Sequence, residues 1–341
     1  MSSTDREMMS RALQLAAKGR YTTSPNPAVG CVIALDGAVV AEGYTRPAGG
    51  NHAEIEALQS AGNIVGATAY VTLEPCSHQG KTGPCADALI AAGIARVVIA
   101  GEDPNPQVAG AGIKKLQDAG IEVDVGLLED QARDINSGFI KRQEQGTPWV
   151  TVKMAASLDG RTAMASGQSQ WITTPAARQD VQRLRATCCA IITGIGTQLM
   201  DDPSLTVRIT NEDVGVVDPL RQPLRVVVDS RLQMSPEARM FSQPGATVVA
   251  TLDGAEQRTK AEALTAAGAE VIFLPALGEH IDLQALLVEL AGRDCNKVLV
   301  EAGAGLAGAF IAEGLLDELV CYWAPKLSGN EARPMFNLPI E

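Results

Sequence analysis

Four residues in the first quarter of the chain have the types and the spacing of a catalytic zinc site. His52 is followed two residues later by Glu54, while Cys76 comes directly after Pro75 and Cys85 lies further on. A catalytic zinc ion takes three protein ligands and keeps a fourth position open, and one imidazole with two thiolates supplies those three. Zinc makes hydroxide available at neutral pH, and Glu54 is then placed to shuttle protons. The set has the H-x-E and P-C signature of zinc nucleobase deaminases.

The spacing of the cysteines departs from the usual P-C-x-x-C, because eight residues separate Cys76 from Cys85. A zinc site accommodates such an insert if it loops out and returns at the start of the next helix, where we expect Cys85. Two other interpretations stay open: His52 and the cysteines are unrelated buried residues, or they form a closed structural site with His78 as the fourth ligand. The second leaves Glu54 without a role.

A glycine-rich sequence near the end of the chain indicates a nucleotide site. The motif Gly303-Ala-Gly305-Leu-Ala-Gly308 follows a strand-like run and opens a helix-like run, so its backbone N–H groups could cradle a pyrophosphate. A Rossmann dehydrogenase carries this motif at its first strand and an acidic residue about 20 positions later, which is missing here. The motif therefore favours a dinucleotide without that fold. Packing glycines at a strand–helix junction are the alternative interpretation.

The elements that must position these residues alternate between helix and strand in both halves, which predicts layered α/β architecture. In the first half we expect helices at 5–19, 52–62, 85–93 and 112–120, and strands at 31–35, 38–44, 67–76, 96–101 and 121–126. A polar, helix-like stretch at 129–148 ends in a Gly/Pro break, which predicts domains 1–146 and 147–341. In the second half we expect buried strands at 149–155, 190–194, 224–229, 246–251, 270–274 and 297–303, and a surface loop at 209–222.

The charge balance excludes one class of partner. The chain has 341 residues and carries 28 Lys and Arg against 40 Asp and Glu, a formal net charge of −12. Nucleic-acid binding needs clustered positive charge, and single-strand binding also needs aromatic stacking, yet aromatic residues are only 4% of the chain. We therefore expect no nucleic-acid partner. A small phosphorylated ligand remains compatible, because a few local donors such as His78 and Lys81 suffice for it.

The cysteines and the apolar runs indicate where the protein works. Seven cysteines, an odd number, argue against a disulfide framework and favour a reducing cytoplasm. No run of about 20 apolar residues predicts a membrane span, and the charged start does not have the pattern of a signal peptide. We therefore expect a cytoplasmic protein without a membrane partner.

Motifs in both halves together resemble the bacterial bifunctional riboflavin-biosynthesis deaminase/reductase family. In the first half these are Ser24-Pro-Asn26-Pro27-x-Val-Gly30, His52-Ala-Glu54, the run from Thr72 to Cys85 with its long insert, and Glu102-Asp103-Pro104-Asn105-Pro106. In the second half they are Lys153-x-Ala-x-Ser157-Leu-Asp159-Gly160, Ser169-x-Trp171-Ile-Thr, Gly194-x-Gly196-Thr197, Asp201-Asp202-Pro203-x-Leu-Thr-x-Arg208 and Val300-Glu301-Ala-Gly.

The resemblance implies a cytidine-deaminase-like three-layer domain followed by a dihydrofolate-reductase-like domain. It implies Zn²⁺ for hydrolytic deamination of a diamino-ribosylamino-pyrimidinone phosphate, and NADPH for reduction of its ribosyl group to ribityl. It also implies a homo-oligomer, a dimer or tetramer through the second domain. Family members usually run on through a further strand, so a C-terminal truncation of the second domain is one expectation for this sequence.

The resemblance also assigns residues to roles. In the deaminase it implies a substrate pocket lined by Asn26, His78, Lys81, Asp103 and Asn105. In the reductase it implies catalytic Lys153 and Glu301, and substrate contacts from Ser169, Arg185, Leu205 and Arg208. Cofactor contacts would come from Ala155, Trp171, Thr197, Asp201, Ser230, Gly303, Ala304, Gly305, Leu306, Ala307, Gly308 and Ala309.

Taken one at a time, several of these residues have structural alternatives. Asn26 and Asn105 sit in Pro-rich turns, where Asn is common for backbone reasons. Guanidinium groups at Arg185 and Arg208 suit a ribose phosphate, yet an ion pair is the commoner fate of a single arginine. Trp171 alone would more often be a core residue.

Two other functions fit less of the sequence. A nucleoside or transfer-RNA deaminase with an appended nucleotide-binding domain predicts a basic surface, which the acidic balance disfavours. A non-catalytic nucleotide-binding regulator predicts the loss of Glu54, a zinc ligand, Lys153 or Glu301, and all of these are present.

Overall fold

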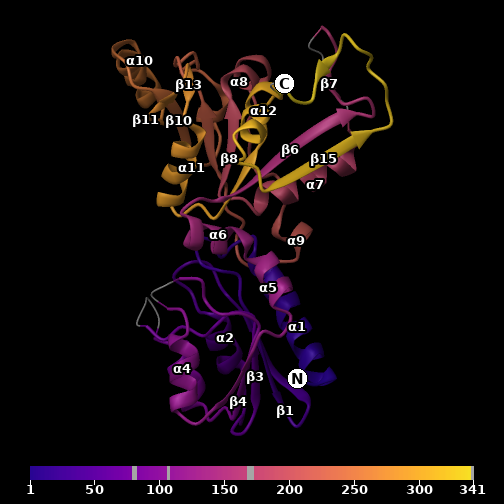
Figure 1. Cartoon of the computed structure of the whole chain (residues 1–341), viewed down its shortest axis with the longest axis vertical. Helices are drawn as coiled ribbons and strands as arrows, with labels where there is room; N and C mark the ends of the chain where they lie inside the picture. The colour runs from indigo at the N-terminus through magenta and orange to yellow at the C-terminus, as the bar shows by residue number, and fades with distance from the viewer. Residues whose placement is uncertain (79–82, 106–107, 167–172, 339–341) are drawn as a thin grey trace. The chain divides into compact units, whose positions relative to one another are not determined.

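A computed structural model describes residues 1–78, 83–105, 108–166 and 173–338. The chain forms two compact units, each with its own sheet (Figure 1). The first comprises Met1–Gly146 and the short segment Gly215–Leu220, and the second comprises Thr147–Val214 and Arg221–Glu341. The units meet in sequence at Gly146, which takes a φ of 70° as it ends a helix, a conformation that glycine adopts without strain.

The first unit is built on a five-stranded sheet in the order β2-β1-β3-β4-β5. Strand β1 is antiparallel to its neighbours β2 and β3, whereas β3, β4 and β5 are parallel. A turn at Asp36 and Gly37, both with positive φ, joins β1 to β2, as the sequence predicts. The strands are β1 (Gly30–Leu35), β2 (Ala38–Tyr44), β3 (Thr68–Val71), β4 (Arg96–Ile99) and β5 (Glu122–Val125).

Helices cover both faces of this sheet, which confirms the expected three-layer domain. Met9 and Ala12 of α1 pack on one face together with Ala132 of α5. On the other face, Ala57 of α2 and Leu89 of α3 share a core with α4. The helices are α1 (Ser3–Gly19), α2 (Ala53–Ser60), α3 (Cys85–Ala91), α4 (Ala111–Asp118), α5 (Glu129–Ile135) and α6 (Ser137–Gln145).

The second unit is built on a seven-stranded sheet in the order β11-β10-β9-β8-β14-β6-β15, whose neighbours are all parallel. Its central strands are continuous apolar runs buried on both faces, as expected for a parallel sheet covered by helices. The strands are β6 (Trp149–Ser157), β8 (Ala190–Gly194), β9 (Leu224–Val228), β10 (Thr247–Leu252), β11 (Ala269–Leu274), β14 (Lys297–Val300) and β15 (Glu318–Ala324).

Two separate cores fill the space between this sheet and its helices. Leu286 and Leu290 of α11 and Phe310 of α12 pack on one face, while Leu264 of α10 packs on the other with Met240. The helices are α7 (Pro175–Ala186), α8 (Ile195–Asp201), α9 (Asn211–Val214), α10 (Ala255–Ala266), α11 (Leu283–Gly292) and α12 (Ala304–Ala312), with a 3-10 turn at Arg239–Ser242. Short strand pairs join β7 (Arg161–Ala163) to β16 (Arg333–Pro334), and β12 (Ala276–Leu277) to β13 (His280–Ile281).

Several elements differ from the sequence-based expectations: the strand expected at 67–76 ends at Val71, and the short strands β7, β12, β13 and β16 were not expected. The stretch at 129–148 forms α5 and α6 rather than one helix, because the buried Asn136 between them turns its amide to the backbone of Ala28. The expected loop at 209–222 contains α9. Edge strand β15 was not expected, since its exposed Leu319 and Trp323 do not follow a buried-strand pattern.

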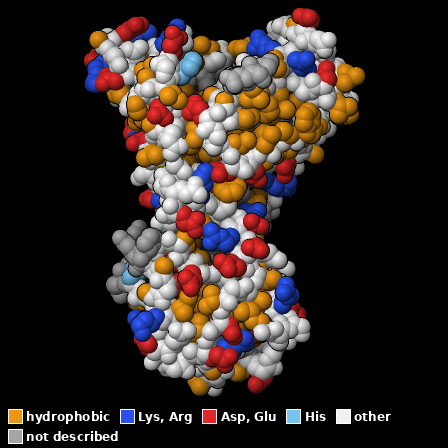
Figure 2. Space-filling view, viewed as in Figure 1, with side chains coloured by type: hydrophobic (Ala, Val, Ile, Leu, Met, Phe, Trp, Pro, Cys, Tyr) orange, Lys and Arg blue, Asp and Glu red, His pale blue; other side chains and the backbone are white. Residues whose placement is uncertain are grey.

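Apolar side chains gather over the region of β6 and β15 (Figure 2). Leu319 is 43% and Trp323 52% exposed, and Leu327 beyond the strand is 77% exposed. Exposed apolar residues grouped on an edge strand are typical of a surface that another element or chain covers. Among the described residues, no helix combines the length and apolar character that crossing a membrane requires.

Candidate active sites

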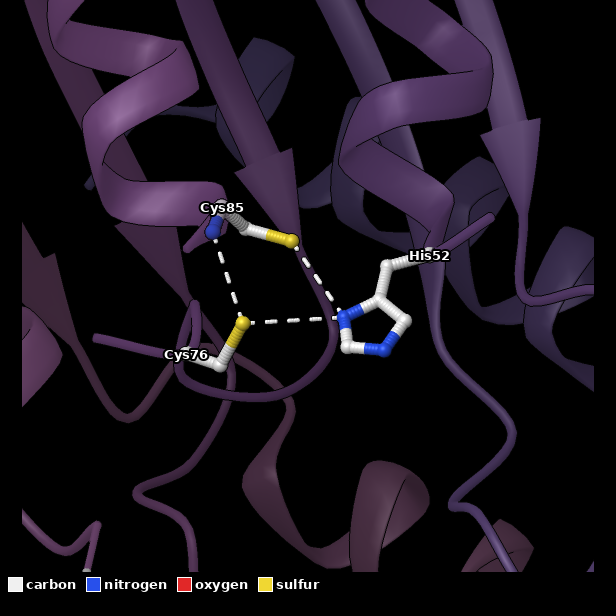
Figure 3. A group of neighbouring side chains, drawn as sticks. All are labelled: His52, Cys76 and Cys85. Atoms are coloured by element: carbon white, nitrogen blue, oxygen red, sulfur yellow. Dashed lines mark hydrogen bonds between the residues drawn. The ribbon is translucent and has the colours of Figure 1, made fainter. Parts of the chain in front are cut away.

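Three side chains from different elements of the first unit converge on one point (Figure 3). His52 is the N-cap residue of α2, Cys76 lies in the loop after β3, and Cys85 is the first residue of α3. The Nδ1 atom of His52 lies 3.6 Å from Cys76 Sγ and 3.3 Å from Cys85 Sγ. The insert between the cysteines therefore does return at a helix start, as the sequence predicts.

The donor set and its spacing fit a zinc ion. The three ligand atoms lie within 4.8 Å of one another, and with Zn–S near 2.3 Å and Zn–N near 2.0 Å a tetrahedral ion separates nitrogen from sulfur by about 3.5 Å. One imidazole and two thiols are the ligands zinc prefers in a three-ligand site. His78 is exposed and is not part of this group, so the arrangement favours the open, catalytic interpretation over a closed structural site.

Hydrogen bonds prepare one of these thiols for ionisation. A hydrogen bond from the Cys85 thiol lowers the pKa of Cys76, although burial opposes the shift. The backbone N–H of Cys85 also donates to Cys76 Sγ over 3.4 Å. Donating that thiol proton raises the pKa of Cys85. A thiolate is the form that binds a metal, so the site already favours it on Cys76.

Glu54 lies in the first turn of α2 beside this group and is only 3% exposed. Burial raises the pKa of its carboxyl to about 7, and the charge on His52 acts in the opposite direction. A carboxyl group that titrates near neutral pH is suited to accept and return a proton. Burial raises the pKa of the Cys31 thiol on β1, and the nearby charge of Glu54 adds to that shift.

Glu74, a residue to which the sequence analysis gave no role, organises the loop between β4 and α4. Its buried carboxylate accepts hydrogen bonds from the backbone N–H groups of Asp103 at 3.2 Å and Gly110 at 3.0 Å, and of Gly112 and Ile113 at 2.8 and 3.2 Å. Four donors to one carboxylate fix the path of the chain from β4 to α4. The only sequence feature that could have indicated a role for Glu74 is its position inside the Thr72–Cys85 motif.

The described substrate residues predicted for this unit lie in loops, and Asp103 among them is close enough to Cys76 to feel its charge. Asn26, Asp103 and Asn105 are half-buried, and Asp103 accepts a hydrogen bond from the Asn105 N–H over 2.9 Å. Burial raises the pKa of Asp103, while the Asn105 N–H and the charge of His78 act in the opposite direction. His78 is thus close enough to influence Asp103. Lys81 lies outside the described residues.

The second unit contains a buried cluster of one carboxylate and two cations. Glu301, at the end of β14, pairs with Arg185 of α7 through two hydrogen bonds of 2.5 and 3.0 Å. Lys153 of β6 lies 3.5 Å from the same carboxylate. Burial opposes ionisation of Glu301, yet the charges of Arg185 and Lys153 outweigh it and lower its pKa to about 2. The cluster carries one net positive charge.

The two arginines expected at a phosphate differ in their surroundings. Arg185 directs three nitrogens to protein acceptors, because its Nη1 also donates to the Thr206 carbonyl over 3.0 Å. The structure thus gives Arg185 an ion pair, the commoner fate of a single arginine. Arg208 is exposed, and the buried Gln182 holds its backbone N–H at 2.9 Å. Leu205 beside them is buried, and Ser169 lies outside the described residues.

The glycine-rich motif divides into an open part and a packed part. The Gly303 N–H donates to Thr197 Oγ1 over 3.2 Å, so two of the predicted cofactor contacts lie together. A Cβ on Gly305 would meet nothing within 4 Å, whereas one on Gly308 would lie 2.1 Å from the Asn337 carbonyl. Gly308 is therefore a packing glycine, and the buried Ala307 shares that role. The open start of α12 fits a phosphate group.

The other predicted cofactor residues lie along the same sheet. Ala155 is half-buried on β6, Asp201 is exposed at the end of α8 and Ser230 is half-buried just beyond β9. The residues Ala304, Leu306 and Ala309 form the first turns of α12 with half-buried side chains. Trp171 lies outside the described residues.

Comparisons with known proteins match both units. Residues 2–101 match the cytidine and deoxycytidylate deaminase zinc-binding region, and residues 148–339 match the RibD C-terminal domain. The riboflavin biosynthesis protein RibD of Escherichia coli is 51% identical over 98% of this chain and 91% of its own length. The solved structure of Acinetobacter baumannii RibD superposes with a TM-score of 0.89 at 45% identity, covering 99% of this chain and 91% of that one.

A third relative carries a descriptive name. The structure from Thermotoga maritima described as a diaminohydroxyphosphoribosylaminopyrimidine deaminase/5-amino-6-(5-phosphoribosylamino)uracil reductase is 34% identical and superposes with a TM-score of 0.87. It covers 99% of this chain, which spans 91% of that structure.

Proposed function

The chain belongs to the family of the riboflavin biosynthesis protein RibD, and from that premise we propose how its own residues divide the family's two reactions between the two units. The protein is a bifunctional enzyme of riboflavin biosynthesis. It hydrolytically deaminates a diamino-ribosylamino-pyrimidinone phosphate with zinc, and then reduces the ribosyl group of the product to ribityl with NADPH. The deaminase is assigned to residues 1–146 and the reductase to residues 147–341.

The convergence of His52, Cys76 and Cys85 carries the deaminase assignment. These three residues hold the zinc ion, which when bound supplies the Lewis acidity that makes hydroxide available at neutral pH. Glu54 takes up the proton released from water and delivers it to the departing amino group. Its burial and its pKa near 7 suit both directions of transfer.

The loops around this centre bind the substrate in the same proposal. Asn26, Asp103 and Asn105 contact the pyrimidine and the ribose, and Glu74 supports the loop that presents Asp103. His78 and Lys81 contact the phosphate, since both follow Cys76 in the insert. A few such donors are enough for one phosphate in a chain whose overall charge is negative.

In the reductase, Lys153 and Glu301 act at the reacting carbon of the ribosyl group. NADPH, when bound, supplies the hydride. Reduction also needs a proton, and the Lys153 ammonium is a donor that Glu301 holds in place at 3.5 Å. Arg185 positions Glu301 through two hydrogen bonds to its carboxylate. Ser169, Leu205 and Arg208 complete the substrate site, with exposed Arg208 as the candidate for its phosphate.

The proposed cofactor contacts follow the β8, β9 and β14 side of this site. The start of α12, from Gly303 to Leu306, faces the pyrophosphate together with Thr197. Further contacts come from Ala155, Trp171, Asp201 and Ser230. Ala307, Gly308 and Ala309 belong to the same proposed contact segment, in which Gly308 also lets α12 lie close to the Asn337 backbone.

Replacing Glu54 tests the deaminase assignment. Glu54→Gln removes the proton carrier but keeps a side chain of the same size, so we expect ammonia release to fall by about 10²- to 10⁴-fold. Metal analysis should still find zinc, because Glu54 is not among the three ligands. Glu42→Gln, in a surface pair with Arg11, serves as the matched control. Undiminished ammonia release by the Glu54 variant would contradict the assignment.

The assembly and location of the enzyme are part of the proposal. We propose a homo-oligomer, a dimer or tetramer, formed through the second unit; the exposed apolar side chains on edge strand β15 support it.

The substrate is a small molecule, and the acidic balance supports the absence of a nucleic-acid partner. None of the seven cysteines, all of which lie in the described residues, forms a disulfide, which supports a reducing, cytoplasmic location. Light scattering of a Trp323→Lys variant tests the assembly, which should shift to smaller species.

A further inference from the structure

The turn after β9 is held in one unusual conformation by a buried carboxylate. Asp229 is fully buried and accepts hydrogen bonds from the backbone N–H groups of Gln233 at 2.6 Å and Met234 at 2.9 Å. Leu232, which directly precedes Gln233, has a φ of 46°, a left-handed conformation that a branched residue seldom adopts. Such a conformation persists only where the surrounding structure enforces it, and is common at ligand sites.

This turn presents Ser230 and Arg231. The Ser230 carbonyl accepts a hydrogen bond from Thr251 Oγ1 over 3.3 Å, and the Arg231 carbonyl accepts one from Lys260 Nζ, also over 3.3 Å. Lys260 is itself paired with Glu256 at 2.6 Å. The backbone is thus anchored on both residues, while the Arg231 side chain is exposed and, across the described parts of the chain, has no carboxylate within ion-pair distance.

The position of this turn on the sheet relates it to the reductase site. β14, β8 and β9 are parallel neighbours, so their carboxyl ends lie on one edge, where α8, α10 and α12 also lie (Figure 1). The edge runs from Glu301 and the Gly303 loop after β14, past Thr197 in α8 after β8, to Ser230 and Arg231 after β9. Strands about 4.8 Å apart place the ends of β14 and β9 roughly 10 Å from each other.

This order matches the order of the parts of NADPH. The nicotinamide must lie near Lys153 and Glu301, and the pyrophosphate near the open start of α12. The adenosine then continues along the edge toward β9. The 2′-phosphate on its ribose is the group that NADPH has and NADH lacks. An unpaired guanidinium can bind a phosphate through two parallel hydrogen bonds.

We propose that Arg231, together with the Ser230 hydroxyl, binds the 2′-phosphate of NADPH and so selects NADPH over NADH. The inference rests on the reductase function proposed above and adds to it the residue that distinguishes the two cofactors. Asp229 serves as a positioning residue, because it fixes the turn without reaching the ligand.

Ligand binding to the full-length protein tests this directly. Calorimetry with adenosine 2′,5′-bisphosphate and with 5′-AMP compares two probes that differ by the one phosphate. Arg231→Ala should weaken the bisphosphate by about ten-fold or more and leave 5′-AMP within two-fold, because a charge-assisted contact is lost from one probe alone. In steady state, KM for NADPH should rise by a similar factor, while KM for NADH and kcat at saturation stay unchanged.

Two further variants separate recognition from structure. Arg231→Lys keeps the charge and should recover part of the bisphosphate affinity. Arg293→Ala removes a cation paired with Glu270 and Glu289 elsewhere in the unit and should leave the preference unchanged. Equal weakening of both probes by Arg231→Ala, or an unchanged bisphosphate affinity, overturns the proposal. A wild-type protein that binds the bisphosphate but oxidises no NADPH in the presence of deaminated substrate contradicts the reductase function instead.

Discussion

The metal site of the first unit and the ion cluster of the second unit differ in how their buried polar groups are stabilised. In the first, the ligand atoms of His52, Cys76 and Cys85 lie within 4.8 Å of one another, a donor set that a bound cation stabilises. In the second, Glu301 already has two cations within 3.5 Å, so the cluster is stable without a ligand. The first site should therefore depend on zinc, and the second should contribute to the stability of its own unit.

The difference also explains which site is easier to recognise from sequence. The three metal ligands lie at the ends of elements within 34 positions, and their types indicate one chemistry. Lys153, Arg185 and Glu301 are common residue types spread along most of the second unit. Nothing in their spacing indicates that they meet, so that cluster was accessible only through the family resemblance.

Removing a metal ligand should have the largest effect. Cys85→Ser leaves two ligands for zinc, so we expect the metal content to fall well below one per chain and ammonia release to fall to background. Reduction of the deaminated substrate should stay within two-fold, because its residues lie in the other unit. Cys321→Ser, a half-buried thiol of the second unit, is the matched control. Zinc retained at full content by the Cys85 variant would count against this ligand set.

Replacing Lys153 of the ion cluster should impair reduction and leave deamination intact. Lys153→Ala removes the proposed proton donor, and we expect reduction to fall by about 10²-fold or more with deamination unchanged. Lys297→Ala, which removes a lysine paired with Glu318 at 3.2 Å, should alter neither rate. If Lys153→Ala oxidises NADPH at the wild-type rate, the assignment of reduction to the ion cluster is contradicted.

Neutralising the carboxylate should weaken the second unit itself. Glu301→Gln leaves buried Arg185 without its partner, which costs about 3 kcal/mol of unfolding free energy. Thermal unfolding of the variant should show a lower midpoint for the second unit alone. Glu256→Gln, which breaks an exposed pair with Lys260, should leave that midpoint nearly unchanged. Equal shifts in the two variants would show that burial of the cluster does not matter.

The contribution of Glu301 to the stability of the second unit should also depend on pH. The pKa of Glu301 is lowered to about 2 in the folded state, below the value near 4.3 of an unfolded glutamate. Its contribution is therefore complete above about pH 4.5 and is lost as the pH falls toward 2. Acid titration of wild type and Glu301→Gln should converge at low pH. Parallel curves over that range would contradict the lowered pKa.

A smaller effect is expected where Glu74 supports the substrate loop of the first unit. Glu74→Gln replaces an acceptor of four backbone N–H groups by an amide that cannot accept all of them. We expect KM for deamination to rise by about ten-fold with zinc content unchanged, because Asp103 loses its support. Glu102→Gln, exposed on the same loop, is the control. A loss of zinc would instead place Glu74 among the groups that support the metal.

Much of the fold follows from local patterns, and the exceptions have physical causes. Buried parallel strands such as β14 follow from apolar runs, and helices such as α1 follow from apolar positions at helical spacing. The break at Asn136 depends on a partner 108 residues away, and β15 is an edge strand whose half-exposed side chains do not alternate cleanly. Long-range pairing of this kind cannot be inferred from a local window.

The roles of the site residues were harder to predict, because the sequence does not show which side chains already have hydrogen-bond or ion-pair partners in the folded protein. The sequence indicates that Arg185 suits a phosphate, but its two bonds to Glu301 appear only in the fold. Likewise, the three glycines of the 303–308 motif look equivalent until the Asn337 backbone is seen against Gly308. The metal ligands could be predicted without this information, because one imidazole and two thiols form a zinc site whenever the fold brings them together.

One measurement tests most directly whether the two units carry separate chemistries. Ammonia release and NADPH oxidation are followed together before and after zinc is removed with a chelator, with the deaminated pyrimidine supplied for the second reaction. We predict that ammonia release disappears and returns when zinc is added back, while NADPH oxidation with the deaminated substrate continues at its original rate. Equal loss of both activities on zinc removal would contradict the division of the enzyme into a metal-dependent and a metal-independent site.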